Sequence, residues 1–82
     1  MERCSLSDIQ PGQRAEVVAL RVSGAMRRRL LDIGLIENTA VTCLGRSPLG
    51  DPSAYRIRGA VIALRAEDGR DILVRPLREG IL

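Results

Sequence analysis

The sequence of 82 residues carries thirteen basic residues, all of them arginine, against ten acidic ones, and it contains neither histidine nor lysine. Without histidine the commonest general base and metal ligand is missing, and without lysine the lysine-containing phosphate-binding loop and Schiff-base chemistry are excluded. A chain this short also leaves little room for a buried catalytic cavity. We therefore expect a single domain over residues 1–82, with its core over about residues 5–76, that is not an enzyme and holds no cofactor.

The sequence lacks the signals of export and of membrane insertion. Its longest uncharged apolar run, Gly59 to Leu64, is far shorter than the roughly 20 residues of a membrane-spanning helix. The first residues, MERCSLSDIQPG, lack the apolar core of a signal peptide, so we expect a cytoplasmic protein. Cys4 and Cys43 are far apart and form no CxxC pair, which favours two reduced thiols over a disulfide or a metal site.

The first predicted elements are a helical turn and a strand. Ser5 can cap one turn of helix because Asp8 follows three residues later, and the Pro11-Gly12 pair then ends that turn. From Gln13 to Val22 polar and apolar side chains first alternate and then become more apolar, which predicts a strand with a kink near Val18.

A short helix is predicted after this strand. Ser23 can cap it, and apolar residues recur at helical spacing through Leu30 and Ile33. Gly34 supplies the left-handed residue that ends it. The triplet Arg27 to Arg29 covers the remaining surface of the helix. It can serve as a basic docking face, although sequence physics alone favours a solvated flank.

A second strand and a stiff loop follow the helix. Asn38 can adopt the positive φ of a turn, after which Thr39 to Leu44 forms a β-branched strand that Gly45 ends. In the segment Pro48 to Pro52 two prolines and a glycine surround Asp51. This segment must turn, and it has few conformations open to it.

The alternation of Tyr55 and Ile57 with arginines predicts a strand with one apolar and one charged face. Tyr55 is expected to be half-buried in it, with its hydroxyl at the surface. Gly59 then indicates a bulge or bend, after which Ala60 to Leu64 continues as a more buried strand bent away from the first.

The C-terminal part contains a predicted hairpin. The segment Glu67 to Arg70 includes an Asp-Gly pair, which favours a type I′ turn into a last strand from Asp71 to Val74 that Pro76 closes. The tail from Leu77 to Leu82 is expected to fray. Together these elements predict a mainly β fold, a small barrel of about five strands with one short helix after the first strand.

The remaining chemical sites have weak support. Glu67, Asp68 and Asp71 carry the oxygen ligands of a hard cation, but they lack the spacing of a calcium loop, and charged residues are usual at a hairpin tip. Nucleic-acid binding is suggested by the arginines alone, and Tyr55 is the one aromatic residue on which a base could stack. We therefore expect no metal site and no nucleic-acid ligand.

Several motifs occur in an order that resembles one known family. They are SLSDIQPGQ, MRRRLLDIGL, SPLGDP, RGAVIALR and a final ILVRP, and they extend from about Ser5 to Val74. The set is similar to that of the FeoA family, small cytosolic partners in bacterial ferrous iron uptake. The resemblance implies an SH3-like barrel with a short helix and an accessory or regulatory role beside FeoB, the membrane ferrous iron transporter with a cytosolic GTP-binding domain. It implies no iron carriage by the protein itself, and transition-metal binding is a description of the family as a whole.

The sequence departs from the family pattern at four positions. Asn38 and Ser47 stand where the family usually has glycine and alanine, and Ala60 stands where an aromatic residue is frequent. Gly69 replaces an alanine of a short helical turn, so a helical turn and the Asp-Gly hairpin are both open at this point.

The resemblance, with the protruding helix and loop, predicts a partner surface. We expect the helix and an adjacent loop to contact the cytosolic region of FeoB. The residues assigned to this surface are Arg27, Arg28, Arg29, Leu30, Ile33, Pro48, Leu49, Gly50, Asp51 and Pro52. Structural roles are assigned to Gly12, Gly34, Gly59 and Arg65. We expect a monomer that reaches the membrane only through its partner.

Two alternatives to this function remain open. Similar SH3-like domains occur at the C-terminus of iron-dependent repressors of the DtxR type, but they are attached to a helix-turn-helix domain, for which 82 residues leave no room. The other alternative is a small nucleic-acid-binding barrel, which steeply salt-dependent binding to DNA or RNA would reveal.

Overall fold

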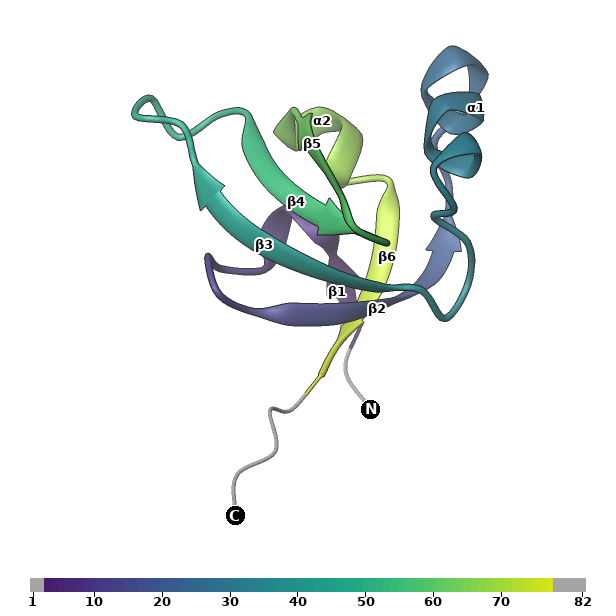
Figure 1. Ribbon diagram of the computed structural model, residues 1–82, viewed down its shortest axis with the longest axis horizontal. Coiled ribbons are helices and arrows are strands. Elements are labelled where there is room, and N and C mark those ends of the chain that lie inside the picture. The colour runs from purple at the N-terminus through teal and green to yellow at the C-terminus, as the bar shows by residue number, and fades with distance from the viewer. Residues whose placement is uncertain (1–2, 78–82) are drawn as a thin grey trace.

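The computed structural model describes residues 3–77, which form one six-stranded antiparallel sheet with short helical connections (Figure 1). In chain order the elements are β1 (Cys4–Ser5), the one-turn helix η1 (Leu6–Asp8), β2 (Arg14–Leu20), α1 (Gly24–Asp32), β3 (Ala40–Arg46), β4 (Ser53–Ile57), β5 (Ala60–Leu64), α2 (Ala66–Gly69) and β6 (Ile72–Pro76). The strands lie in the order β1-β6-β2-β3-β4-β5, so β1 and β5 form the two edges of the sheet.

The sheet bends around a core built by alternate residues of its strands. Successive strand residues point to opposite faces, so one side chain in two enters the core. Leu6 from η1 and Leu30 from α1 join them, each with 0% of its surface exposed. The buried strand residues are Ala15, Val17, Val41, Cys43, Tyr55, Ile57, Ile62, Leu64, Ile72 and Val74. The predicted mainly β barrel with a helix after its first long strand is confirmed.

β2 is the central strand of this barrel. It pairs with β3 over Arg14 to Glu16 and with β6 from Ala15 to Leu20, and its register shifts between Val17 and Ala19. A bulge of this kind bends a strand, so the predicted kink near Val18 is confirmed. The bend separates the end of β2 from β3 while β2 stays paired with β6, and α1 follows directly in the chain.

η1 and α2 pack against each other beside the N-terminal edge of the sheet. The Ser5 hydroxyl donates to the Arg70 carbonyl at 2.8 Å, and the Ser5 N–H donates to the Asp8 carboxylate at 3.1 Å. A Cβ on Gly69 would lie 3.2 Å from the Ser7 nitrogen, so glycine permits this close approach. The helical turn that Ser5 and Asp8 predict is present and is held in place by α2.

Of the two arrangements that the sequence leaves open at Gly69, the helical turn is confirmed and the Asp-Gly hairpin is wrong. Residues 66–69 form the helical turn α2 instead, and its first N–H, that of Ala66, donates to the Asp51 carboxylate at 2.8 Å. The Gly69 N–H closes the turn on the Arg65 carbonyl at 3.0 Å. A carboxylate from a distant loop therefore satisfies the start of a helix where the local sequence favours a hairpin.

The tight hairpin lies at Arg58-Gly59 instead. Both residues have positive φ, 49° and 84°, as a two-residue type I′ turn requires, and Ile57 pairs with Ala60 across it. β5 therefore reverses along β4, and the prediction of one strand bent at Gly59 is wrong. β5 is also less buried than predicted, because its residues alternate between the core and the surface.

One strand is longer than predicted, and another is not predicted. β3 continues through Gly45 to Arg46, with a register shift between Cys43 and Gly45, so Gly45 lies at a bulge and does not end the strand. β1 is not predicted at all, because two residues are too few to show a periodicity. Leu77 is the one residue of the predicted tail that the structure describes, and its N–H donates to the Arg14 carbonyl at 3.0 Å. The fraying predicted for the rest of the tail falls outside the described residues.

Gly34 joins the end of α1 to the β4–β5 turn. The Leu35 N–H donates to the Leu30 carbonyl at 2.9 Å and the Gly34 N–H to the Leu31 carbonyl at 3.0 Å, with Gly34 at φ 94°. This is the left-handed helix end that the sequence predicts. The Arg58 Nε donates to the Gly34 carbonyl at 2.9 Å, and a Cβ on residue 34 would lie 2.5 Å from the Arg58 Cδ.

Tyr55 is buried, and the prediction of a surface hydroxyl is wrong. The residue is 2% exposed, and its hydroxyl donates to the Leu6 carbonyl at 3.4 Å because η1 lies over this part of the core. Burial raises the pKa of the Tyr55 phenol above its ordinary value of 10.0, and a hydrogen bond with Ser53 lowers it by less.

The stability of the protein at high pH should report on Tyr55. Below pH 10.0 the phenol is protonated in both states, whereas above it the unfolded chain ionises first, so the free energy of unfolding should fall as the pH rises. Tyr55 is the single aromatic residue, so tyrosinate absorbance follows it directly. Tyr55→Phe should remove this part of the pH dependence. An ordinary pKa in the folded protein would contradict the burial.

Gly34→Ala should lower the free energy of unfolding by roughly 2–3 kcal/mol, because it combines a left-handed backbone with a clash against Arg58. Gly12→Ala is the matched control: Gly12 also has a φ of 90°, but a Cβ there meets nothing within 4 Å, so the loss should be roughly 1 kcal/mol. Urea denaturation measures both. Equal losses in the free energy of unfolding for the two variants would show that the Arg58 side chain moves away from residue 34 without an energetic cost.

Candidate functional site

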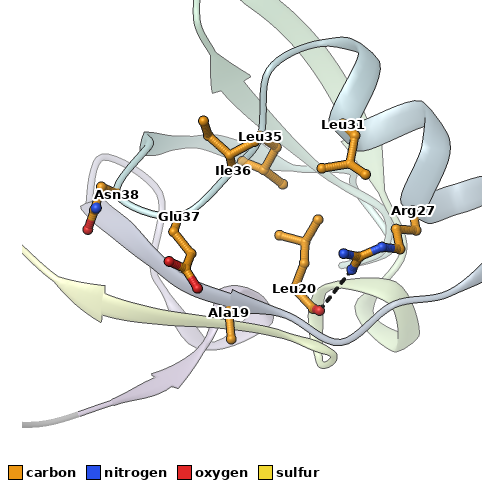
Figure 2. A pocket seen from close by; sticks show the side chains of 8 residues that line it. All are labelled: Ala19, Leu20, Arg27, Leu31, Leu35, Ile36, Glu37 and Asn38. Carbon is orange, nitrogen blue, oxygen red and sulfur yellow. Dashed lines mark hydrogen bonds between the residues drawn. The ribbon is translucent and has the colours of Figure 1, made fainter.

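A hollow of about 560 Å³ lies between the end of β2, the helix α1 and the connection from α1 to β3 (Figure 2). We name it the α1 groove. Its lining residues are Ala19, Leu20, Arg27, Leu31, Leu35, Ile36, Glu37 and Asn38. Because α1 lies at one end of the molecule, the groove belongs to that end (Figure 1).

The centre of the α1 groove is apolar. Leu30 takes the core side of α1, so the next residue, Leu31, faces away from the core and is 41% exposed. Ile36 is 49% exposed on the opposite wall, and Figure 2 shows both side chains gathered with Leu20 and Leu35. Large apolar side chains grouped in the open mark a surface that a partner can cover.

The wall that carries Ile36 is held by hydrogen bonds. The Thr39 hydroxyl accepts from the Ile36 N–H at 3.1 Å and donates to the Gly34 carbonyl at 3.2 Å. The Asn38 N–H donates to the Val17 carbonyl at 2.8 Å, with Asn38 at the positive φ of 72° that the sequence predicts. The connection is therefore fixed to β2, and the groove is formed before any partner arrives.

Opposite charges flank the apolar centre. The Arg27 guanidinium donates to the Leu20 carbonyl at 3.1 Å, and Glu37 lies on the other side of the groove in Figure 2. The groove thus suits an apolar side chain of a polypeptide, with polar contacts to either side. Its lining residues pair no nucleophile with a base.

The residues assigned to the helix part of the partner surface fall into two groups. Arg27, Arg28 and Arg29 are exposed, and the first two also line a second hollow of about 280 Å³ on α1. Ile33 is partly buried against the core. Leu30 is 0% exposed, so its assignment to a partner surface needs correction: the helix uses it to attach to the barrel.

Of the groove residues, the sequence assigns only Arg27 to the partner surface, and the two most exposed apolar ones that it misses are Leu31 and Ile36. Helical spacing identifies the core side of α1 through Leu30, and it leaves the neighbouring Leu31 without an assigned partner. Ile36 comes just after the Gly34 cap, outside the periodic segment. The signal in the sequence for this groove is a large apolar residue on each side of the helix end, at positions that the helical spacing does not place in the core.

The Pro48–Pro52 loop lies at the opposite end of the molecule from α1 (Figure 1). β3 separates them, because Ala40 follows the α1 connection and Arg46 leads into the loop. Seven strand residues at about 3.3 Å each place the two ends of β3 roughly 20 Å apart. The prediction that the helix and this loop are adjacent is wrong.

The loop is closed by hydrogen bonds and displays the side chain of Leu49. The Ser47 N–H donates to the Pro52 carbonyl at 3.0 Å, and the Gly50 N–H donates to the Ser47 carbonyl at 2.8 Å. The Asp51 carboxylate caps α2, as described above. Leu49 is 94% exposed at the tip. Pro48, Gly50, Asp51 and Pro52 are exposed as well.

The remaining residues with assigned roles lie in turns. Gly12 and Gly59 occupy turns at φ 90° and 84°, and Arg65 precedes α2, with its carbonyl as the first acceptor of that helix. Within residues 3–77 no three cysteine or acidic side chains lie close enough together to hold a metal ion. No helix in that part of the chain has the length and apolar character needed to cross a membrane.

Comparisons with known proteins agree with this architecture. The FeoA domain family model matches residues 4–76. The Fe(2+) transport protein A/Fe(2+) transporter FeoB fusion protein of Porphyromonas gingivalis is 35% identical over 69 residues, which are 84% of this chain and 8% of that relative. The solution structure of FeoA from Chlorobium tepidum is 35% identical, with a TM-score of 0.85 over 90% of this chain and 70% of that one.

A more distant structure shares the fold alone. The FeoA of Stenotrophomonas maltophilia, determined as a zinc complex and described as an SH3 domain protein, is 23% identical with a TM-score of 0.75. The likeness covers 85% of this chain and 87% of that one. The family match takes in every element from β1 to β6. The chain therefore belongs to the FeoA domain family.

Proposed function

We propose that this protein regulates ferrous iron uptake by binding the cytosolic region of a FeoB-type transporter through the α1 groove. The observation that carries the proposal is the groove, a preformed hollow in which Leu31 and Ile36 remain exposed. Family membership and the Porphyromonas gingivalis relative, in which a FeoA and a FeoB are fused in one protein, support the identity of the partner.

The proposed role is that of an accessory protein and not of an enzyme or an iron carrier. The groove offers apolar contacts and two charges, which suit protein recognition. The Stenotrophomonas maltophilia protein is described as a candidate activating factor for ferrous iron transport, in line with such a role. The protein would act in the cytoplasm as a monomer and reach the membrane through the transporter.

The proposed contact surface consists of the α1 groove with the exposed arginines beside it, Arg27 to Arg29. The Pro48–Pro52 loop is not part of it, because it lies at the other end of the molecule (Figure 1). Leu30 is also left out because it belongs to the core.

Leu31→Glu should weaken binding to the cytosolic GTP-binding domain of the same organism's FeoB by about tenfold or more, because it places a charge in the apolar centre of the groove. Isothermal titration calorimetry measures the affinity. Leu44→Glu is the matched control, since Leu44 is 39% exposed against 41% for Leu31 but lies on β3 outside the groove. Both variants should keep the stability of the wild type. Equal affinities for the two would contradict the proposed site.

Charge reversal at Arg27 and Arg28 should weaken the same interaction without unfolding the domain, because both side chains are exposed. The loss should shrink at high salt, where exposed charges are screened. The double variant Arg14→Glu with Arg70→Glu serves as the control for net charge, because it also reverses two exposed arginines, and both lie outside α1. An unchanged affinity of the variant reversed at Arg27 and Arg28 at low salt would remove these two arginines from the proposed surface.

A further inference from the structure

β5 is an edge of the sheet with no strand on its outer side. It pairs with β4 alone, and it is the last strand in the order β1-β6-β2-β3-β4-β5. The opposite edge, β1, is only two residues long, whereas β5 has five residues in continuous register with β4. β5 is therefore the one long sheet edge within residues 3–77.

The free backbone groups of this edge belong to Val61 and Ala63. In a two-residue hairpin the closing pair, here Ile57 and Ala60, is hydrogen-bonded, and bonded and non-bonded pairs then alternate along the strands. The N–H and C=O groups of Val61 and Ala63 consequently point away from β4. Across residues 3–77 no turn, loop or helix provides them with a hydrogen-bond partner. Val61 is 58% exposed, and Ala63 is exposed too.

The edge also lacks the features that normally prevent another strand from pairing. Natural edge strands carry a charged side chain, a proline or a bulge, or are very short. β5 reads Ala-Val-Ile-Ala-Leu, with no charge and no proline, and its register with β4 shows no bulge. An unprotected edge that a folded protein retains is a template for strand addition by a partner.

The charges around β5 indicate what kind of strand fits. Arg58 precedes the strand in the hairpin turn and Arg65 follows its last residue, and both are exposed. On the outer face Arg56 lies opposite Val61. If two copies of β5 paired antiparallel through Val61 and Ala63, the arginine end of one strand would meet the arginine end of the other. Like charges there disfavour a second copy, and acidic ends are favoured.

We infer that β5 binds an extended segment of a partner protein by strand addition, a segment that is uncharged in its middle and acidic at both ends. Backbone hydrogen bonds from Val61 and Ala63 hold the segment, and its acidic ends reach Arg58 and Arg65. This surface is a second contact site, beyond the α1 groove. It does not depend on the identity of the partner proposed for that groove.

The test uses the whole protein labelled with nitrogen-15 and an acetylated, amidated peptide Glu-Val-Thr-Val-Thr-Glu. Without peptide the Val61 and Ala63 amides should exchange with deuterium far faster than those of Ile62 and Leu64. With peptide, protection should appear at Val61 and Ala63. The peptide with lysine in place of each glutamate should bind about tenfold more weakly.

Two chemical controls distinguish strand addition from other binding. In an added strand every second N–H faces the β5 edge, so either the two valine N–H groups or the two threonine N–H groups face it. N-methylation of the pair that faces β5 should abolish binding, and N-methylation of the other pair should preserve it. Ala63→Pro removes one edge N–H and should weaken binding by about tenfold, whereas Ala63→Ser keeps that N–H and should not. The methylated peptides give the answer even where the proline variant fails to fold.

Three outcomes would overturn the inference. The first is protection that appears elsewhere, for example at Leu31 and Ile36, which would assign the peptide to the α1 groove. The second is protection of Val61 and Ala63 that rises with protein concentration in the absence of peptide, which would show that two copies pair. The third is the lack of protection at millimolar peptide.

Discussion

The contact between Arg58 and Gly34 ties the end of α1 to the β4–β5 turn. The Arg58 side chain donates to the Gly34 carbonyl, and in this arrangement a Cβ on residue 34 would lie 2.5 Å from the Arg58 Cδ. Gly34 also ends α1 and begins the connection that carries Ile36. This contact lies where the two walls of the α1 groove join. Leu30 attaches the helix wall to the core, and the hydrogen bonds of Thr39 and Asn38 hold the wall that carries Ile36.

Two neighbouring apolar residues of α1 have different surroundings, one in the core and one at the surface. Leu30 is fully buried and attaches α1 to the core, whereas the neighbouring Leu31 stays open beside Ile36. A barrel this small buries little apolar surface. We therefore expect large apolar residues that stay outside its core to serve another function. Arg58 lies in the turn that precedes β5 and donates to the Gly34 carbonyl at the end of α1, so it links these two elements.

Local patterns predicted the elements whose causes are local. Alternation predicts β2, the change to a more apolar pattern predicts its kink, and residue type alone predicts the left-handed backbone of Gly34 and Asn38. The local sequence does not decide the two Xaa-Gly pairs: the bend at Gly59 is a hairpin whose Arg58 contacts Gly34, and of the two arrangements open at Gly69 the helical turn forms, capped by Asp51. The groove was missed for the same reason. Periodicity describes which side of a helix is buried, but not which exposed residues a distant connection brings together.

The most direct test of the account is an isotope-labelled NMR titration of this protein with the cytosolic GTP-binding domain of its own organism's FeoB, in both nucleotide states. The account predicts that amide shifts concentrate at Leu31, Gly34, Ile36 and Glu37, with the loop around Leu49 unaffected. Amide shifts at that loop without shifts in the α1 groove would contradict the account, and so would the absence of shifts in both nucleotide states.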